Sequence, residues 1–189
     1  MKFLSIDAGT NESACVLMKD DAQDVMKVEY HAILPNDAML RIIEEHSSLV
    51  VIEDVTHMGM PVGRDVFETV RWSGRFHQVA HDKGGVVEYI PRTRIKINLC
   101  GNVRAKDPHI RQALIDRYGG DQKAIGGKKC RDCKGKKWKG RNHEPCVTCK
   151  ETGYLTPVGA LHGISSHVWS ALAVAVTYLD EQRSPKNAN

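Results

Sequence analysis

The sequence predicts an α/β fold, a mixed sheet covered by helices on both faces, with a small four-cysteine insertion. Two observations predict the sheet. The chain opens with two short apolar segments around a glycine-containing turn, and later apolar segments alternate with helical ones. The insertion is predicted by two C-x2-C pairs in the most basic stretch of the 189 residues. A hydrophobic content of 41% is enough for one ordinary core beside it.

The N-terminal elements follow from the apolar pattern. The first two strands form a hairpin around Gly9, and the fourth strand is a buried segment that ends in the carboxylate of Glu53. Pro35 separates the third strand from the first helix. The expected order is strands over 3–6, 13–18 and 25–34, a helix over 37–46, and a strand over 48–53.

Three more helices are expected, over 62–80, 107–118 and 167–175. Pro108 opens the second of these, and the glycines at 119–120 end it. The predicted organisation is a core over 1–126, the insertion over 127–156, a return to the core over 157–183, and a disordered tail over 184–189.

The four cysteines form a C-x2-C-x12-C-x2-C array that predicts one structural Zn²⁺ per chain. Each C-x2-C pair puts two thiolates on one tight turn, and two such turns complete a tetrahedral shell. Glycines follow the pairs at 135 and 153, and the segments resemble the CxxCxG knuckles of DnaJ-type and zinc-ribbon modules. Two disulfides or a redox pair are the alternatives, which a chain without a secretory signal disfavours. The predicted ligands are Cys130, Cys133, Cys146 and Cys149.

Charge is concentrated around these cysteines. Residues 123–143 contain nine of the 27 Lys and Arg residues but only one of the 23 Asp and Glu residues, in a chain of net charge +4. Cations interleaved with an aromatic ring suit a phosphate backbone, whereas the alternative is a solvated loop. The predicted DNA-binding residues here are Lys128, Lys129, Lys136, Lys137, Trp138 and Lys139.

The longest apolar run, residues 171–176, is much shorter than the roughly 20 residues that a membrane-spanning helix needs. We therefore expect a cytoplasmic protein that has no membrane partner.

Asp7 and Glu53 stand at the ends of the first and fourth strands. If these strands are neighbours, both carboxylates emerge near one edge of a cleft. Two such groups repel each other unless a divalent cation lies between them. The pair is therefore a candidate metal site.

Four segments in order resemble the RuvC family of Holliday junction resolvases, within the RNase H and retroviral-integrase superfamily. These are Ile-Asp-Ala-Gly-Thr at 6–10, Val-Ile-Glu at 51–53, the segment 96–106, and the alanine-rich helix 167–175. Several stretches look closest to the RuvC-like proteins of bacteriophages, which would place the chain in a bacterial host cytoplasm. Actin-like ATPases share the first segment, but their further glycine-rich phosphate loops do not follow here, so no nucleotide cofactor is expected.

The resemblance implies an RNase H-like sheet and a metal-dependent endonuclease that cuts branched DNA by two-metal-ion phosphodiester hydrolysis. Two Mg²⁺ or Mn²⁺ ions are implied, with Asp7 bridging them and Glu53 and His167 completing the shells. Ser170 stands where such enzymes carry a late-helix acid, so His162 and Asp107 remain competing ligands. Phosphate-binding roles are implied for Lys96, Arg104 and Lys106.

The resemblance also implies a homodimer that presents two active sites to a four-way junction. Holliday junctions, forks, flaps and packaging intermediates all remain open as substrates. A branched-DNA-binding module with weak or no cleavage is the main rival, because Ser170 lacks a charge.

Overall fold

A computed structural model describes residues 1–20, 26–46, 48–56, 59, 61–140 and 142–184. The chain divides into two compact units. One, called here the core unit, comprises Met1–Arg111 and the segment from Ile164 onward; the other, the cysteine unit, comprises Gln112–Gly163. The expected insertion over 127–156 lies inside the cysteine unit, and the expected tail lies outside the described residues except for Ser184.

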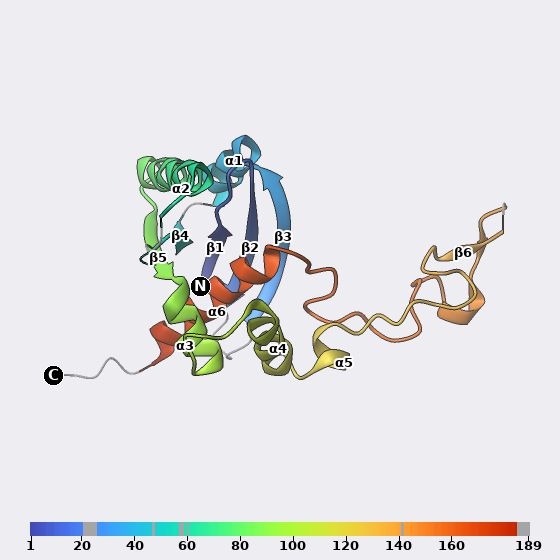
Figure 1. Ribbon diagram of the computed structural model, residues 1–189. Helices are drawn as coiled ribbons and strands as arrows, with labels where there is room; N and C mark the ends of the chain where they lie inside the picture. Colours follow the sequence, from blue (N-terminus) through green and yellow to red (C-terminus); the bar gives the residue numbers. More distant parts are fainter. Residues whose placement is uncertain (21–25, 47, 57–58, 60, 141, 185–189) are drawn as a thin grey trace. The chain divides into compact units, whose positions relative to one another are not determined.

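The core unit is built on a five-stranded mixed sheet of order β3-β2-β1-β4-β5 (Figure 1). Strands β1, β2 and β3 form an antiparallel meander, whereas β4 and β5 run parallel to β1. This confirms the predicted mixed sheet, although β5 was not predicted. The strands are β1 (Lys2–Asp7), β2 (Glu12–Asp20), β3 (Met26–Pro35), β4 (Leu49–Asp54) and β5 (Val86–Pro91).

Helices cover both faces of the sheet, as predicted (Figure 1). Helices α1 and α2 pack together on one face, and α6 packs across β1, β2 and β4 on the other. Helix α3, which was also not predicted, follows β5 directly and contacts α6. The helices are α1 (Asn36–His46), α2 (Arg64–Asp82), α3 (Arg92–Cys100), α4 (Asp107–Arg117) and α6 (Val168–Arg183).

The alternation of side chains along β1 divides the core into two layers. Leu4 and Ile6 belong to a buried cluster with Met39 of α1 and Phe76 of α2. Phe3 faces the opposite way, and its ring lies 5.3 Å from that of Tyr178 in α6. Helix α6 is buried along most of its length, which explains its nearly unbroken apolar sequence.

The cysteine unit contains little regular structure, and loops make up most of it. Two isolated bridges, Gly126 with Val158 and Lys129 with Tyr154, join its two long segments. Its short elements are α5 (Asp121–Ala124), the paired strands β6 (Trp138–Lys139) and β7 (Glu144–Pro145), and a 3-10 helix over Val147–Cys149. In the described part of the chain, no helix has the length and apolar character needed to cross a membrane.

Candidate functional site

Asp7 and Glu53 lie side by side at the ends of two adjacent parallel strands. Strands β1 and β4 pair with Ile6 opposite Ile52, and both isoleucines point into the layer beneath α1 and α2. The next residue on each strand therefore turns to the face covered by α6. The sequence pattern predicted this arrangement.

A hydrogen-bonded network fixes the turn that follows Asp7. The backbone N–H of Gly9 donates to the Ser13 hydroxyl (3.1 Å), which donates to the Asn36 side-chain oxygen (2.6 Å). The Asn36 amide then donates back to the Gly9 carbonyl (3.0 Å). Ser13 and Asn36 are buried, so this closed network holds the end of β1 against the start of α1.

The first turn of α6 approaches Asp7. Nδ1 of His167 lies 3.2 Å from Oδ2 of Asp7, and the nearby Ser170 hydroxyl favours the ionised form of Asp7 and so acts to lower its pKa. His167, the N-cap residue of α6, and Ser170 share one helical face because they are three positions apart. The His167 side chain is 74% exposed, so it reaches the carboxylate from the solvent side.

Arg92, the first residue of α3, lies among these groups. Its Nη1 is 3.1 Å from Oε2 of Glu53 and 3.3 Å from the Ser170 hydroxyl. Its Nη2 donates to Oδ1 of Asp107, at the start of α4. One guanidinium therefore connects β4, α4 and α6.

Burial makes both carboxylates harder to ionise. It raises the pKa of Asp7, although the nearby His167 and Arg92 oppose this effect. Burial, together with the negative charge of Asp7, raises the pKa of Glu53 to about 7 despite the neighbouring Arg92. The like charges of the pair are thus only partly compensated by the protein's own cations.

Three hollows of about 240, 560 and 400 Å³ lie around Asp7, Glu53 and His167. Asp7 lines the first two, and His167 lines the second and third. The first hollow is also lined by Glu53, Arg92 and Lys96, and the third by Ser170, Asp107 and Arg111. Asp7 is therefore accessible from two of the hollows and Glu53 from one.

The other predicted residues of this region occupy different places. Lys96 lines the same hollow as both carboxylates. Arg104 and Lys106 are exposed in the segment between α3 and α4, where their backbone N–H groups donate to Asn102 and His109. His162, a competing ligand in the sequence analysis, packs edge-on against Tyr154 inside the cysteine unit.

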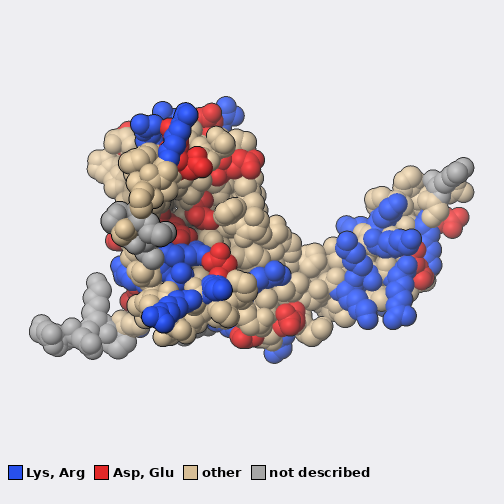
Figure 2. All heavy atoms as spheres, viewed as in Figure 1, with Lys and Arg blue, Asp and Glu red and all other residues tan. Residues whose placement is uncertain are grey.

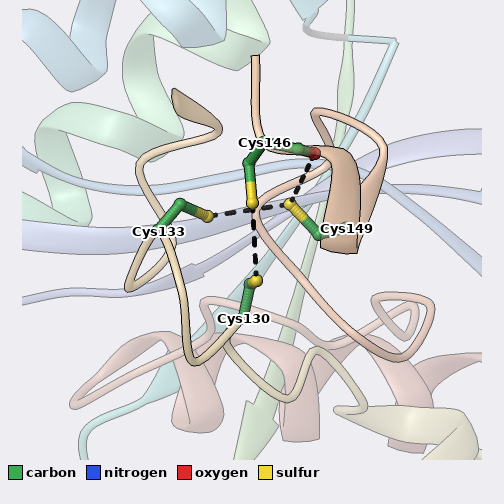
Figure 3. Close-up of side chains that lie close together, drawn as sticks. All are labelled: Cys130, Cys133, Cys146 and Cys149. Carbon is green, nitrogen blue, oxygen red and sulfur yellow. Dashed lines mark hydrogen bonds between the residues drawn. The ribbon is translucent and has the colours of Figure 1, made fainter. Parts of the chain in front are cut away.

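The four predicted zinc ligands converge in the cysteine unit (Figure 3). Their sulfur atoms all lie within 4.8 Å of one another, with 3.8 Å between Cys130 and Cys146 and 3.6 Å between Cys133 and Cys149. A tetrahedral site with Zn–S bonds of about 2.3 Å requires S···S distances of about 3.8 Å. All four are free, buried cysteines, which argues against the two-disulfide alternative.

Glycines shape both knuckles, as the motif predicted. Gly135 and Gly153 have φ angles of 88° and 82°, a region that suits glycine. A side chain on Gly153 would meet the Gly135 carbonyl oxygen at 2.7 Å. Burial raises the pKa of the Cys133 thiol, but hydrogen bonds from the backbone N–H groups of Lys137 and Gly135 and from the Cys149 and Cys130 thiols together lower it to about 7.

Among the described residues, these cysteines are the one set of three or more His, Cys, Asp or Glu side chains whose ligand atoms lie so close together. The atoms of Asp7, Glu53 and His167 are more widely spread. Arg92 explains part of the spread, because Glu53 is turned toward its guanidinium.

Lys and Arg side chains gather on the surface of the cysteine unit, around the label β6 in Figure 1 (Figure 2). Trp138 is 42% exposed and stands 5.4 Å from the ring of His143. Lys139 pairs with Asp132 at 2.7 Å, which compensates part of its charge. The remaining predicted cations of this surface, Lys128, Lys129, Lys136 and Lys137, lie in loop segments of the same unit.

Solved structures with a similar fold include two of Thermus thermophilus RuvC. One superposes with a TM-score of 0.62 at 13% identity, and a complex with a Holliday junction substrate gives 0.60 at 11%; each comparison covers 97% of this chain and 96% of RuvC. The fowlpox virus Holliday junction resolvase gives 0.50 at 11% identity, covering 96% of this chain and 99% of the resolvase. The chain has a RuvC-like fold.

These structural similarities confirm the predicted fold class, and they do so at a sequence identity of only 11–13%. No family model matches the sequence, and a search of curated proteins also finds no match. In this RuvC-like core, the two strand-end carboxylates and the first turn of α6 meet on one face of the sheet.

Sequence reasoning missed Arg92. The residue is 39 positions from Glu53 and 78 from Ser170 along the chain, so no local pattern connects them. The signal that could have found it is its place directly after Pro91, at the end of the apolar run that becomes β5.

Proposed function

We propose that this protein is a metal-dependent endodeoxyribonuclease that cleaves branched DNA, with Holliday junctions as the reference substrate. The observation that carries the proposal is the partly buried pair of Asp7 and Glu53, side by side on a RuvC-like sheet with His167 beside Asp7. Protein groups compensate this pair incompletely, as the pKa of about 7 for Glu53 indicates. A divalent cation would supply the missing positive charge.

The donor set fits Mg²⁺ or Mn²⁺. Asp7 and Glu53 offer carboxylate oxygens, which hard divalent cations prefer, and His167 offers a nitrogen that suits Mn²⁺ better than Mg²⁺. A divalent cation held by these residues would activate water for attack on phosphorus and stabilise the leaving 3′ oxygen. The protein's own part is to orient these ligands through the sheet, the Gly9–Ser13–Asn36 network and α6.

DNA contacts are proposed for two basic regions. Lys96 lines the hollow beside the carboxylates, and Arg104 and Lys106 are exposed close to α4 along the chain. In the cysteine unit, the exposed Trp138 among lysines suits a phosphate backbone and a stacked base.

The cysteine unit is proposed to bind one structural Zn²⁺, because its four thiols already have the spacing of a tetrahedral sulfur site. Elemental analysis of purified protein should find about one zinc per chain, and Cys130→Ser or Cys149→Ser should lose it. Protein that contains no zinc would refute this assignment.

A homodimer is proposed through the solvent-facing side of α2. Phe67 and Val70 there are 55% and 47% exposed, although both are large apolar residues. Sedimentation equilibrium should show a dimer for the wild type and a monomer for a Phe67→Glu and Val70→Glu double variant. A monomeric wild type at micromolar concentration would remove this proposal.

The test of the proposed substrate class compares a four-way junction with a linear duplex of the same sequence. The wild type with Mg²⁺ or Mn²⁺ should nick the junction near its branch point and leave the duplex intact. Equal cleavage of both would indicate a general nuclease.

A branched-DNA-binding protein with little or no cleavage is the second candidate. Ser170, where RuvC-like enzymes are expected to carry an acid, and the contact between Arg92 and Glu53 both favour it. Tight junction binding without nicking in either metal ion would establish this alternative.

A further inference from the structure

Arg92 introduces a fixed positive charge into the carboxylate site. Arginine stays protonated at all relevant pH values, and its five N–H donors form a planar fork that matches phosphate oxygens. The side chain is 23% exposed, and it contacts Glu53, Ser170 and Asp107 together. It is therefore part of the site rather than a mobile surface group.

The charges of the site suggest what Arg92 replaces. The acid expected on α6 is the neutral Ser170, whose hydroxyl lies 3.3 Å from Nη1 of Arg92. Three carboxylates, those of Asp7, Glu53 and Asp107, are set against one guanidinium. With all three ionised, two negative charges remain before Lys96, which lines the same hollow, is counted. One divalent cation therefore balances these groups, and two would exceed their charge.

The positions of the partners divide the site into two sides. Asp7 lies beside His167, at 3.2 Å, and both offer metal-binding atoms. Glu53 is instead engaged by Arg92 at 3.1 Å. Asp107, the other acidic partner of Arg92, is 80% exposed, so a DNA phosphate can replace it at little energetic cost.

We infer that Arg92 takes the place of one metal ion, so that the site binds a single divalent cation on the side of Asp7 and His167. The guanidinium neutralises Glu53 and presents its remaining donors to the DNA phosphate. This inference rests on the proposed nuclease function, and it changes the expected number of ions from two to one.

The test counts Mn²⁺ bound to the full-length, zinc-loaded protein without DNA at pH 8, using electron paramagnetic resonance. The wild type should bind one Mn²⁺ per chain. Arg92→Ala should bind a second ion, and its total affinity for Mn²⁺ should rise about tenfold, because an opposing charge has been removed. Arg92→Lys, which keeps the charge, should still bind one.

The matched control is Arg94→Ala, which removes another arginine of α3 whose partner is Glu181. It should bind Mn²⁺ like the wild type. If Arg92→Ala does not fold, Arg92→Gln removes the charge with a smaller change in volume and carries the same expectation. Two ions in the wild type, or an unchanged or lower count when the Arg92 charge is lost, would overturn the inference. Junction cleavage is measured in a separate assay. Failure of the nuclease proposal can therefore be distinguished from failure of the inference about the number of bound ions.

Discussion

At the residue scale, Asp7 and Glu53 show how the fold changes the chemistry of two ordinary side chains. The sequence predicted their proximity, because both follow apolar strand segments and parallel neighbours end at the same edge. It did not predict Arg92, whose contacts depend on β5, α3, α4 and α6 meeting in space. The sequence did identify Ser170 as a neutral residue at the position where RuvC-like enzymes are expected to carry an acid on the last helix.

The raised pKa of Glu53 predicts that this residue destabilises the metal-free fold at high pH. A carboxyl group with an ordinary pKa of 4.5 and a folded-state pKa of about 7 contributes stability below pH 4.5, and the contribution is lost as the pH rises to 7. At 1.36 kcal/mol for each pH unit, the loss is at most about 3 kcal/mol. Glu53→Gln should therefore be more stable than the wild type at pH 8.

Urea unfolding followed by circular dichroism, without divalent cations, checks this prediction. The advantage of Glu53→Gln should vanish near pH 4.5, and adding Mn²⁺ at pH 8 should narrow it by stabilising the wild type. A wild type that is more stable than Glu53→Gln at pH 8 would show that the Arg92 contact outweighs burial.

His167 determines the predicted metal preference. Imidazole suits Mn²⁺ better than Mg²⁺, which favours oxygen ligands. His167→Asp should therefore shift the ratio of Mn²⁺- to Mg²⁺-supported junction cleavage toward Mg²⁺, whereas His167→Ala should lose activity with both ions. Identical ratios in the wild type and His167→Asp would exclude His167 as a ligand.

At the element scale, strong local patterns were predictable and weak ones were not. The β1–β2 hairpin, α1 and β4 follow from apolar runs and turns, and the structure agrees to within a few residues. The start of the buried α6 was also predicted, but the helix continues to Arg183, eight residues beyond the expected end at 175. β5 was not predicted because it has no clear buried face. Its side chains are mostly exposed or partly buried, and it begins with the exposed Val86. α3 was missed because Ile95 is its only fully buried residue, so its sequence shows no clear apolar face.

The turn after β1 is the element on which the site depends most directly. A Cβ at Gly9 would lie 2.2 Å from the Glu12 carbonyl oxygen, so the backbone must move. Gly9→Ala should cost about 1–3 kcal/mol of stability and reduce cleavage by displacing Asp7. Thermal unfolding and the nicking rate measure the two effects.

Gly74 provides the matched control, because a Cβ there meets nothing within 4 Å in the middle of α2. Gly74→Ala should stabilise the protein by about 0.5–1 kcal/mol, since alanine is the better helix former. If Gly9→Ala and Gly74→Ala changed the stability by the same amount, the backbone at Gly9 would be shown to accommodate a Cβ without strain.

At the scale of the whole molecule, the chain combines a carboxylate site in one compact unit with a cysteine cluster and a basic surface in another. The motif spacing predicted the cysteine cluster because the ligands of each knuckle are neighbours in sequence. The extent of the unit was harder to predict, since its boundary at Gln112 lies within α4.

The cysteine unit should contribute phosphate contacts that depend on salt. Replacing Lys136 and Lys137 together with Gln should make the slope of log affinity against log salt shallower by about 2, because two phosphate contacts are lost. Replacing Lys27 and Lys83 of the core unit is the matched control and should leave the slope unchanged. Fluorescence anisotropy with a labelled junction measures the affinity of each double variant at several salt concentrations. If the Lys136 and Lys137 variant had the same slope as the Lys27 and Lys83 variant, the lysine-rich surface would not bind DNA.

The central claim is that Asp7 belongs to a metal-dependent site that cleaves branched DNA. Its most direct test measures junction binding and junction nicking in the same samples of wild type and Asp7→Asn, with Mn²⁺ present. The account predicts that Asp7→Asn binds the junction with nearly unchanged affinity but nicks it at least about 100-fold more slowly, because a metal ligand is lost while the basic surfaces remain. Nicking by Asp7→Asn at the wild-type rate would contradict the account.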